Sequence, residues 1–433
     1  MSYVPRPIEP QANARTLEQR RLDTADIHEF VERTVGRSFA QWPPPAWNLD
    51  VLTAASFRLN PQVAVSRAEY ERARASIITA RERPNPTASA SIEHKPSGIE
   101  PSPWVSTFDL DVPIEMPAKR RARVDQAIHA TNAALARVST TAWDVRSRLR
   151  GRLLDVWAAQ RREGVLEREE NIERDIVEIF TKRVQYGEAA QPDLSRARIA
   201  LGQTTLLLSD VRRAAREGRA ATAAAIGIPD ESLAGPLDLS TFDAATPAIA
   251  ADLREAALVA RADVRAALED YAAADDALRL EVARQYPDLH IGPGFGWDQG
   301  TRTWMLAAAA EVPIMNRHRG AIAEASARRD EAAARFTALQ ASVIGAFDAA
   351  RIGVEAARQK LFDAEALVAS QRASVDSVRR QFEAGEIDRL ALRSAELELE
   401  AANLGRADAA AELQQARGLL EDAIQNSIGE RTP

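Results

Sequence analysis

The side chains that could do acid–base or metal chemistry are spread thinly along this sequence. The five histidines are scattered, and none forms the HxxxH or HExxH pair that a helical zinc site needs. A glycine-rich phosphate loop and a GxSxG nucleophile turn are also missing. With no cysteine, thiol catalysis and cysteine–zinc sites are excluded. The sequence therefore predicts a protein that is not an enzyme and that uses no cofactor or bound metal.

A few acidic residues stand apart from those expected on solvated helix faces. Asp109, Asp111 and Glu311 take the polar positions of alternating segments. In a barrel they would face the lumen, where they would either influence ion passage or only keep the lumen wet. Asp193 and Asp388 lie beside two predicted helix turns and would form an acidic ring in an oligomer; Asp193 could equally cap a helix.

The elements that must position these residues are mostly long helices. Among 433 residues there are only 20 glycines and 22 prolines, aromatic residues make up 5%, and charged residues make up 27%. This composition favours long helices joined by narrow seams over several compact cores. A net charge of −7 argues against a nucleic-acid partner. The N-terminus shows no apolar core of a secretory signal, and there is no cysteine to carry a lipid.

The chain contains an internal repeat with a shift of about 200 residues. Val112-Pro113-Ile114 matches Val312-Pro313-Ile314, and Gly187 matches Gly385. An ordered series of such matches indicates a duplicated unit. Each unit is predicted to hold a helix, a strand hairpin and a long helical hairpin, with opening helices at about 50–83 and 248–285. The predicted organisation is an irregular leader (1–47), repeat 1 (48–226; strand hairpin 87–114, tip near 187), a linker (227–247), repeat 2 (248–425; strand hairpin 289–314, tip near 385) and a tail (426–433).

Both strand hairpins show the alternation of a sheet with one apolar face. The apolar positions include Phe108, Leu110, Val112 and Ile114 in the second strand, and Leu306, Ala308, Val312 and Ile314 in the fourth. Trp104, Trp297 and Trp304 lie near the turns, where a girdle of interfacial aromatic residues would sit. The alternation is typical of membrane strands, although a soluble hairpin with one face on a core would show it too.

Four strands are too few to close a membrane barrel, since the smallest barrels have eight. Open edges would leave backbone groups unpaired in hydrocarbon, so such hairpins must be completed by other copies of the chain. A dimer would supply eight strands and a trimer twelve, and the residues alone permit either.

The long helices carry a coiled-coil seam. Leu392, Leu399, Leu413 and Leu420 follow a heptad spacing that only Arg406 interrupts. Alanine follows each position of this series three residues later. The helical hairpins are expected to turn at Gly187 and Gly385, because glycine permits the turn backbone.

This arrangement resembles the TolC-type outer-membrane factors of tripartite efflux pumps, over about residues 48–425. The most specific stretches are Asn60-Pro61, Tyr286-Pro287-Asp288-Leu289 and the second tip, residues 382–388. Residues 113–120 and 313–322 are similar to signatures of the CzcC-like heavy-metal branch.

The resemblance implies a homotrimer with a twelve-stranded outer-membrane barrel and a periplasmic α-helical tunnel. The tips, with Gly187, Asp193, Gly385 and Asp388, would contact a periplasmic adaptor (membrane fusion) protein and, through it, an inner-membrane RND-type pump. The expected function is a passive exit conduit for heavy-metal cations. The alternatives are a conduit for multidrug or organic solutes or for type I secretion, and, from another class, a soluble coiled-coil scaffold. Family members usually carry a cleaved signal, often followed by a lipidated cysteine.

Overall fold

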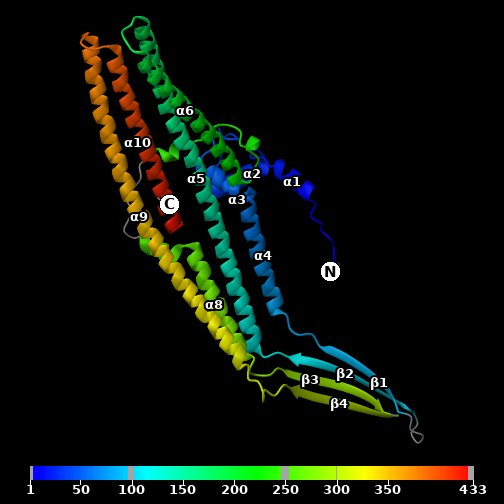
Figure 1. The fold of residues 1–433 in the computed structure, drawn as a ribbon. Helices are drawn as coiled ribbons and strands as arrows, with labels where there is room; N and C mark the ends of the chain where they lie inside the picture. Colours follow the sequence, from blue (N-terminus) through cyan, green and yellow to red (C-terminus); the bar gives the residue numbers. More distant parts are fainter. Residues whose placement is uncertain (1–2, 96–101, 245–252, 299, 428–433) are drawn as a thin grey trace. The chain divides into compact units, whose positions relative to one another are not determined.

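The computed structural model describes residues 3–95, 102–244, 253–298 and 300–427 (Figure 1). It confirms a mainly helical chain with one small sheet. In chain order the elements are α1 (Pro10–Glu18), α2 (Ala25–Val35), α3 (Leu49–Leu59), α4 (Pro61–Arg81), β1 (Thr87–His94), β2 (Trp104–Ile114), α5 (Pro117–Gln185), α6 (Gln191–Ile226), the short helices η1 (Asp230–Ser232) and η2 (Ser240–Phe242), α7 (Leu253–Ala260), α8 (Ala262–Ala283), β3 (Leu289–Asp298), β4 (Thr301–Ala310), α9 (Arg319–Glu383) and α10 (Arg389–Ile424).

Some predicted segments fall outside the described residues. They are most of the first hairpin turn (96–101), the end of the linker with the start of the second repeat (245–252), Gln299 in the second hairpin turn, and most of the tail (428–433). Among the described helices, none has an apolar stretch of the length and purity that a membrane crossing needs.

The chain forms two compact units. One consists of residues 1–65, 140–258 and 343–433, and the other of residues 66–139 and 259–342. The second unit holds the sheet, and the first holds both helical turns. Both turns use glycine in the left-handed region, with φ of 76° at Gly187 and at Gly385. That conformation costs glycine little because it has no Cβ.

The opening helix of each repeat is divided in two, where the sequence predicted one continuous helix. In the first repeat α3 ends at Leu59 and α4 begins at Pro61, with Asn60 extended at ψ 125°. Proline disfavours helix at the residue before it, which explains this break. In the second repeat Arg261 is extended in the same way, at ψ 137°, although no proline follows it.

The N-terminal segment was predicted to be irregular, and the structure differs. It contains α1 and α2, and Ile27 and Val31 of α2 are fully buried in the core of the first unit. Trp47 is also buried there, and its indole N–H donates to the carbonyl of Ala234 at 2.7 Å. Periodicity of a short helix is a weak signal in sequence, so burial against distant residues decides the structure here.

The described part of the predicted linker belongs to that same core. Residues 227–244 pass beside Trp47: the amide of Trp47 donates to Pro236 at 3.0 Å, and that of Asp238 donates back to Trp47 at 2.9 Å. Leu233, Leu239 and Phe242 are buried. This segment is therefore a structural part of the first unit.

Gly227 closes α6 against the break between α3 and α4. Its φ is 95°, and a Cβ at this position would lie 2.8 Å from the carbonyl oxygen of Leu59. The side-chain amide (Nδ2) of Asn60 donates to the carbonyl of Ala225 at 2.8 Å, and Arg20 donates to the carbonyls of Leu59 and Gly227. Only glycine satisfies both the backbone conformation and the close approach.

Candidate functional site

The four strands form one antiparallel sheet in the order β1-β2-β3-β4 (Figure 1). The two hairpins are joined through β2 and β3, with Phe108 opposite Phe295 and Ile114 opposite Leu289. Strands β1 and β4 have no partner on their outer side among the described residues. Each therefore presents a row of backbone donors and acceptors available for pairing.

The register places the apolar positions that the alternation predicted on one face of the sheet. Phe108, Phe295 and Trp304 lie side by side across three strands, as the alternation predicted. This apolar face is uncovered among the described residues, since Trp304 is 82% exposed and Leu306 77% exposed. A continuous exposed apolar surface of this kind marks contact with a membrane or a partner.

The three tryptophans all belong to the apolar face. Trp104 packs edge-on against His94 at 4.7 Å between ring centroids, and Trp304 packs edge-on against Phe295 at 5.1 Å. Trp297 lies opposite Arg302, one pair from the end of the second hairpin. They gather toward the end of the sheet that carries the two turns.

The polar face contains Asp109 and Asp111, as predicted by their positions in β2. Asp109 lies across from Gly294, where any Cβ would collide with its carboxylate. The carboxylate of Asp111 accepts from His290 Nδ1 at 2.9 Å. Glycine in β3 thus makes room for an acidic side chain on a surface of small residues.

Glu311 does not lie in a strand, contrary to the prediction that the fourth strand runs to residue 314. Strand β4 ends at Ala310, which is paired with Leu289, the first residue of β3. Beyond that point there is no strand to pair with, and the amide of Ile314 instead donates to Val312 at 2.8 Å.

Glu311 instead lines a polar cleft at the helical end of the sheet. The cleft has a volume of about 330 Å³. It is lined mainly by charged residues, among them Glu115, Lys119, Arg123, Asp288, His290, Glu311 and His318. Apart from Glu311, sequence reasoning assigned no function to these residues, although three of the segments that carry the family resemblance, 113–120, 286–289 and 313–322, contribute to the cleft.

Asp288 joins the start of β3 to the start of α5. It accepts from the Lys119 ammonium and the Met116 amide, at 2.9 and 3.0 Å. Burial raises the pKa of the Asp288 carboxyl, but these bonds outweigh it and hold the pKa below its usual value. Arg123 pairs with Glu115 and also donates to the carbonyls of Ala80 and Glu82. These contacts fix the sheet to its helices. Among the described residues, no group of three or more acidic, histidine or cysteine side chains is arranged to hold a metal.

At the tips, the two predicted acidic residues are paired with arginines. Asp193 pairs with Arg196 at 2.8 Å and accepts from the amide of Ala190 at 3.3 Å, so it caps α6. Asp388 accepts from the amide of Ala391 at 2.8 Å and pairs with Arg183 of α5 at 2.6 Å. These bonds lower the pKa of the Asp388 carboxyl, the Arg183 bond most of all.

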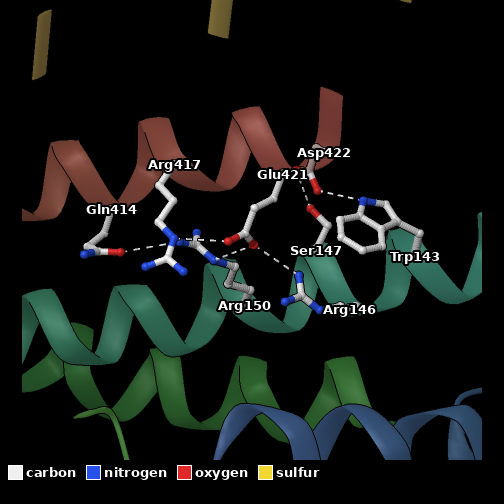
Figure 2. A network of polar contacts seen from close by, with 8 residues as sticks. All are labelled: Trp143, Arg146, Ser147, Arg150, Gln414, Arg417, Glu421 and Asp422. Carbon is white, nitrogen blue, oxygen red and sulfur yellow. Dashed lines mark hydrogen bonds and ion pairs between the residues drawn. The ribbon is translucent and has the colours of Figure 1, made fainter. Parts of the chain in front are cut away.

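Helices α5 and α10 are joined by a ladder of polar contacts from the tip to the C-terminal end of α10. Arg168 pairs with Glu400 at 3.0 Å and Arg162 with Asp408 at 2.6 Å. Figure 2 shows the far end of this ladder, centred on Glu421, whose side chain is 3% exposed. It contacts Arg146, Arg150 and Arg417 at 3.2, 3.5 and 3.1 Å.

Next to Glu421, the carboxylate of Asp422 accepts from the Trp143 indole and the Ser147 hydroxyl, at 2.9 and 2.6 Å (Figure 2). Along α10, three leucines of the predicted leucine–alanine seam, Leu392, Leu413 and Leu420, are buried, and Leu399 is half-buried. Polar contacts therefore set the register of α5 and α10, and apolar contacts supply the burial.

Comparison with known proteins gives consistent results. The family model described as "Outer membrane efflux protein" matches residues 56–228 and 253–424. The chain is 26% identical over 289 residues to the cobalt-zinc-cadmium resistance protein CzcC of Cupriavidus metallidurans, covering 66% of this chain and 67% of that protein.

Several solved structures share the fold, and two of them illustrate the match. The outer-membrane channel OprN superposes with a TM-score of 0.72 at 19% identity, covering 88% of this chain and 90% of that one. The outer membrane protein VceC of Vibrio cholerae superposes with a TM-score of 0.71 at 17% identity, covering 88% and 96%. The family match removes the soluble-scaffold alternative. The chain belongs to the outer membrane efflux proteins, the TolC-type channels of the outer membrane with a periplasmic extension, and it is not an enzyme.

Proposed function

We propose that this chain forms a homotrimeric exit conduit for heavy-metal cations, working with a periplasmic adaptor and an inner-membrane RND-type pump. The observation that carries the choice of substrate is the similarity to a cobalt-zinc-cadmium resistance protein over two thirds of the chain. The conduit itself performs no chemistry, so the free energy for export comes from its partners.

The open edges of the sheet support assembly into a barrel. Inside hydrocarbon, the unpaired groups of β1 and β4 would each cost several kcal/mol. Pairing β1 of one copy with β4 of the next satisfies both edges at once. Three copies of the four-stranded sheet give a twelve-stranded barrel, which exceeds the minimum of eight.

The helices of the first unit support the same assembly. Ile199 and Leu206 of α6 are 61% and 69% exposed, and Ile352 and Phe362 of α9 are 57% and 64% exposed. Apolar side chains spaced along a helix face are expected to be covered by a neighbour. In a ring of copies, α6 of one chain and α9 of the next would cover one another.

In this barrel the apolar face of the sheet meets lipid and the polar face lines the lumen. We assign Trp104, Trp297 and Trp304 to the lipid interface, and Asp109, Asp111 and Glu311 to the wall of the conduit. The tips at Gly187 and Gly385, with Asp193 and Asp388, would contact the adaptor and control opening.

Deletion of the gene tests the substrate. We expect the deleted strain to lose tolerance to at least one of zinc, cobalt, cadmium, copper and silver, and a plasmid copy to restore it. Unchanged tolerance to all five metals, together with new sensitivity to organic solutes, would show instead that the conduit serves a multidrug pump.

Replacement of Asp388 by alanine tests the tip. We expect the trimer to persist but its single-channel conductance to rise, because one of the ion pairs that join α5 to α10 near the tip is lost. Arg196→Ala is a control, since it removes a pair within α6 only. Equal conductance of wild type and Asp388→Ala would contradict the assignment.

The same contact is expected to depend on pH. Because the folded-state pKa of Asp388 lies below its unfolded value, the stabilisation is present above the unfolded pKa of about 3.9 and is lost as pH falls through the folded pKa. Wild-type conductance should therefore rise toward that of Asp388→Ala only below about pH 4. A rise between pH 5 and 7 would point to a different group.

A further inference from the structure

Arginines without ion-pair partners gather at the helical end of the sheet. Four strand ends meet here: the start of β1, the end of β2, the start of β3 and the end of β4. The register shows this, because Thr87 pairs with Asp111, Ile114 pairs with Leu289, and Leu289 also pairs with Ala310. The segments just outside these strand ends carry the residues that we call the arginine collar: Arg81, Arg83, Arg120, Arg121, Arg317 and Arg319.

The collar is available to a ligand. All of its side chains are exposed except that of Arg120, which is half-buried. Within the part of the chain that the structure describes, none of them forms an ion pair. Other cations at the same level are already occupied: Lys119 pairs with Asp288, Arg123 with Glu115 and Arg284 with Glu281.

The acidic residues at this level do not balance the collar. Asp288, Glu115 and Glu281 are neutralised by the pairs just described. The other carboxylates nearby include Glu82 and Glu311, which are exposed, and Asp111, which contacts His290. A chain with a net charge of −7 thus concentrates uncompensated positive charge at one level of one unit. Exposed charge of a single sign attracts a ligand of the opposite sign.

The position of the collar indicates what that ligand is. The segments that carry it lie at the end of the sheet opposite the hairpin turns (Figure 1), next to the last residues of the apolar face, Ile114 and Leu289. If the sheet spans the outer membrane, this end lies at the level of the phospholipid headgroups of the periplasmic leaflet. Arginine side chains are long enough to reach that level from a nearby backbone, and guanidinium binds phosphate through paired hydrogen bonds.

We propose that the arginine collar binds the phosphates of anionic phospholipids and thereby sets the depth of the sheet in the membrane. This inference rests on the proposed function, because it requires that the sheet enters the membrane. Each basic residue near an anionic surface contributes to binding, and a trimer would present three collars in one ring.

Native mass spectrometry of the detergent-solubilised full chain tests the proposal. The variant carries Gln at Arg83, Arg121, Arg317 and Arg319. The control carries Gln at Arg198, Arg372, Arg380 and Arg406, which are exposed, unpaired in the described residues and located on helices of the other unit. Wild type and control should retain phosphatidylglycerol in preference to phosphatidylcholine, and the collar variant should lose on the order of tenfold of that preference.

Equal preference in the collar variant and wild type, or an equal loss in the control, would overturn the proposal. A collar variant with altered ion selectivity but intact lipid preference would overturn it too, by placing the arginines in the lumen. Insertion of the wild-type chain into vesicles distinguishes failure of the collar proposal from failure of the proposed function. If wild type enters no vesicle, both ideas are wrong; if it inserts and conducts without a lipid preference, only the collar is wrong.

Discussion

Replacement of Glu421 by alanine is expected to destabilise the first unit by about 3–5 kcal/mol. The Glu421 carboxylate is buried and contacts three arginines, so its removal leaves their charges uncompensated (Figure 2). Burial already lowers the pKa of Arg150, and Glu421 opposes that effect. Thermal unfolding of the purified chain, followed by the circular dichroism of its helices, measures the loss.

Two further variants make this result specific. Glu421→Gln keeps the size of the side chain and removes its charge, so it should lose most of the same stability. Glu412→Gln removes an ion pair with Lys360 in which both side chains are at least half exposed, and it should cost less than about 1 kcal/mol. Similar losses for Glu421→Gln and Glu412→Gln would show that the buried network does not hold α5 to α10.

Replacement of Gly227 by alanine is expected to cost about 1–2 kcal/mol for the left-handed backbone, and about 1–3 kcal/mol more for crowding. The added methyl group would lie 2.8 Å from the Leu59 carbonyl and 3.1 Å from the Cα of Asn60. The junction of α6 with α3 and α4 must therefore open. The same thermal unfolding experiment measures the change.

Gly202 offers a matched control in the same helix. A Cβ at Gly202 would meet nothing within 4 Å, and alanine favours the helix interior over glycine by up to about 1 kcal/mol. Gly202→Ala should therefore be neutral or stabilising. If the Gly227→Ala variant is as stable as Gly202→Ala, the left-handed backbone and the close approach at Gly227 do not affect the stability of the unit.

The two strand hairpins could be predicted from sequence because their signals are local, whereas the pairing of β2 with β3 joins the two repeats and was not predicted. Alternation has a period of two residues, so the face of Asp109 and Asp111 follows directly from their positions in β2. The tips were predictable for a similar reason, since Gly187 and Gly385 interrupt otherwise continuous helices. The end of β4 was not predictable, because it depends on where β3 begins and not on the residues around Glu311.

What sequence reasoning missed depends on partners that are distant in the chain. The burial of α2 requires a core formed largely by residues more than a hundred positions away, such as Leu149 and Ile226. The pairing of Asp388 with Arg183 likewise joins two repeats. The carboxylate that the sequence placed in an acidic tip is therefore paired with an arginine in the structure. Local periodicity carries no information about such contacts.

Disulfide trapping tests the barrel most directly, because the natural chain has no cysteine and single pairs can be introduced cleanly. One cysteine is placed on β1 and one on β4, at positions scanned along both edges, and the oxidised protein is separated by mass. For at least one cysteine pair, we expect cross-linked dimers and trimers, with the largest species at three times the 47.3 kDa of the chain. If the chains stay monomeric for every cysteine pair, or if cross-linked species contain more than three chains, closure of the sheet by two neighbouring copies is contradicted.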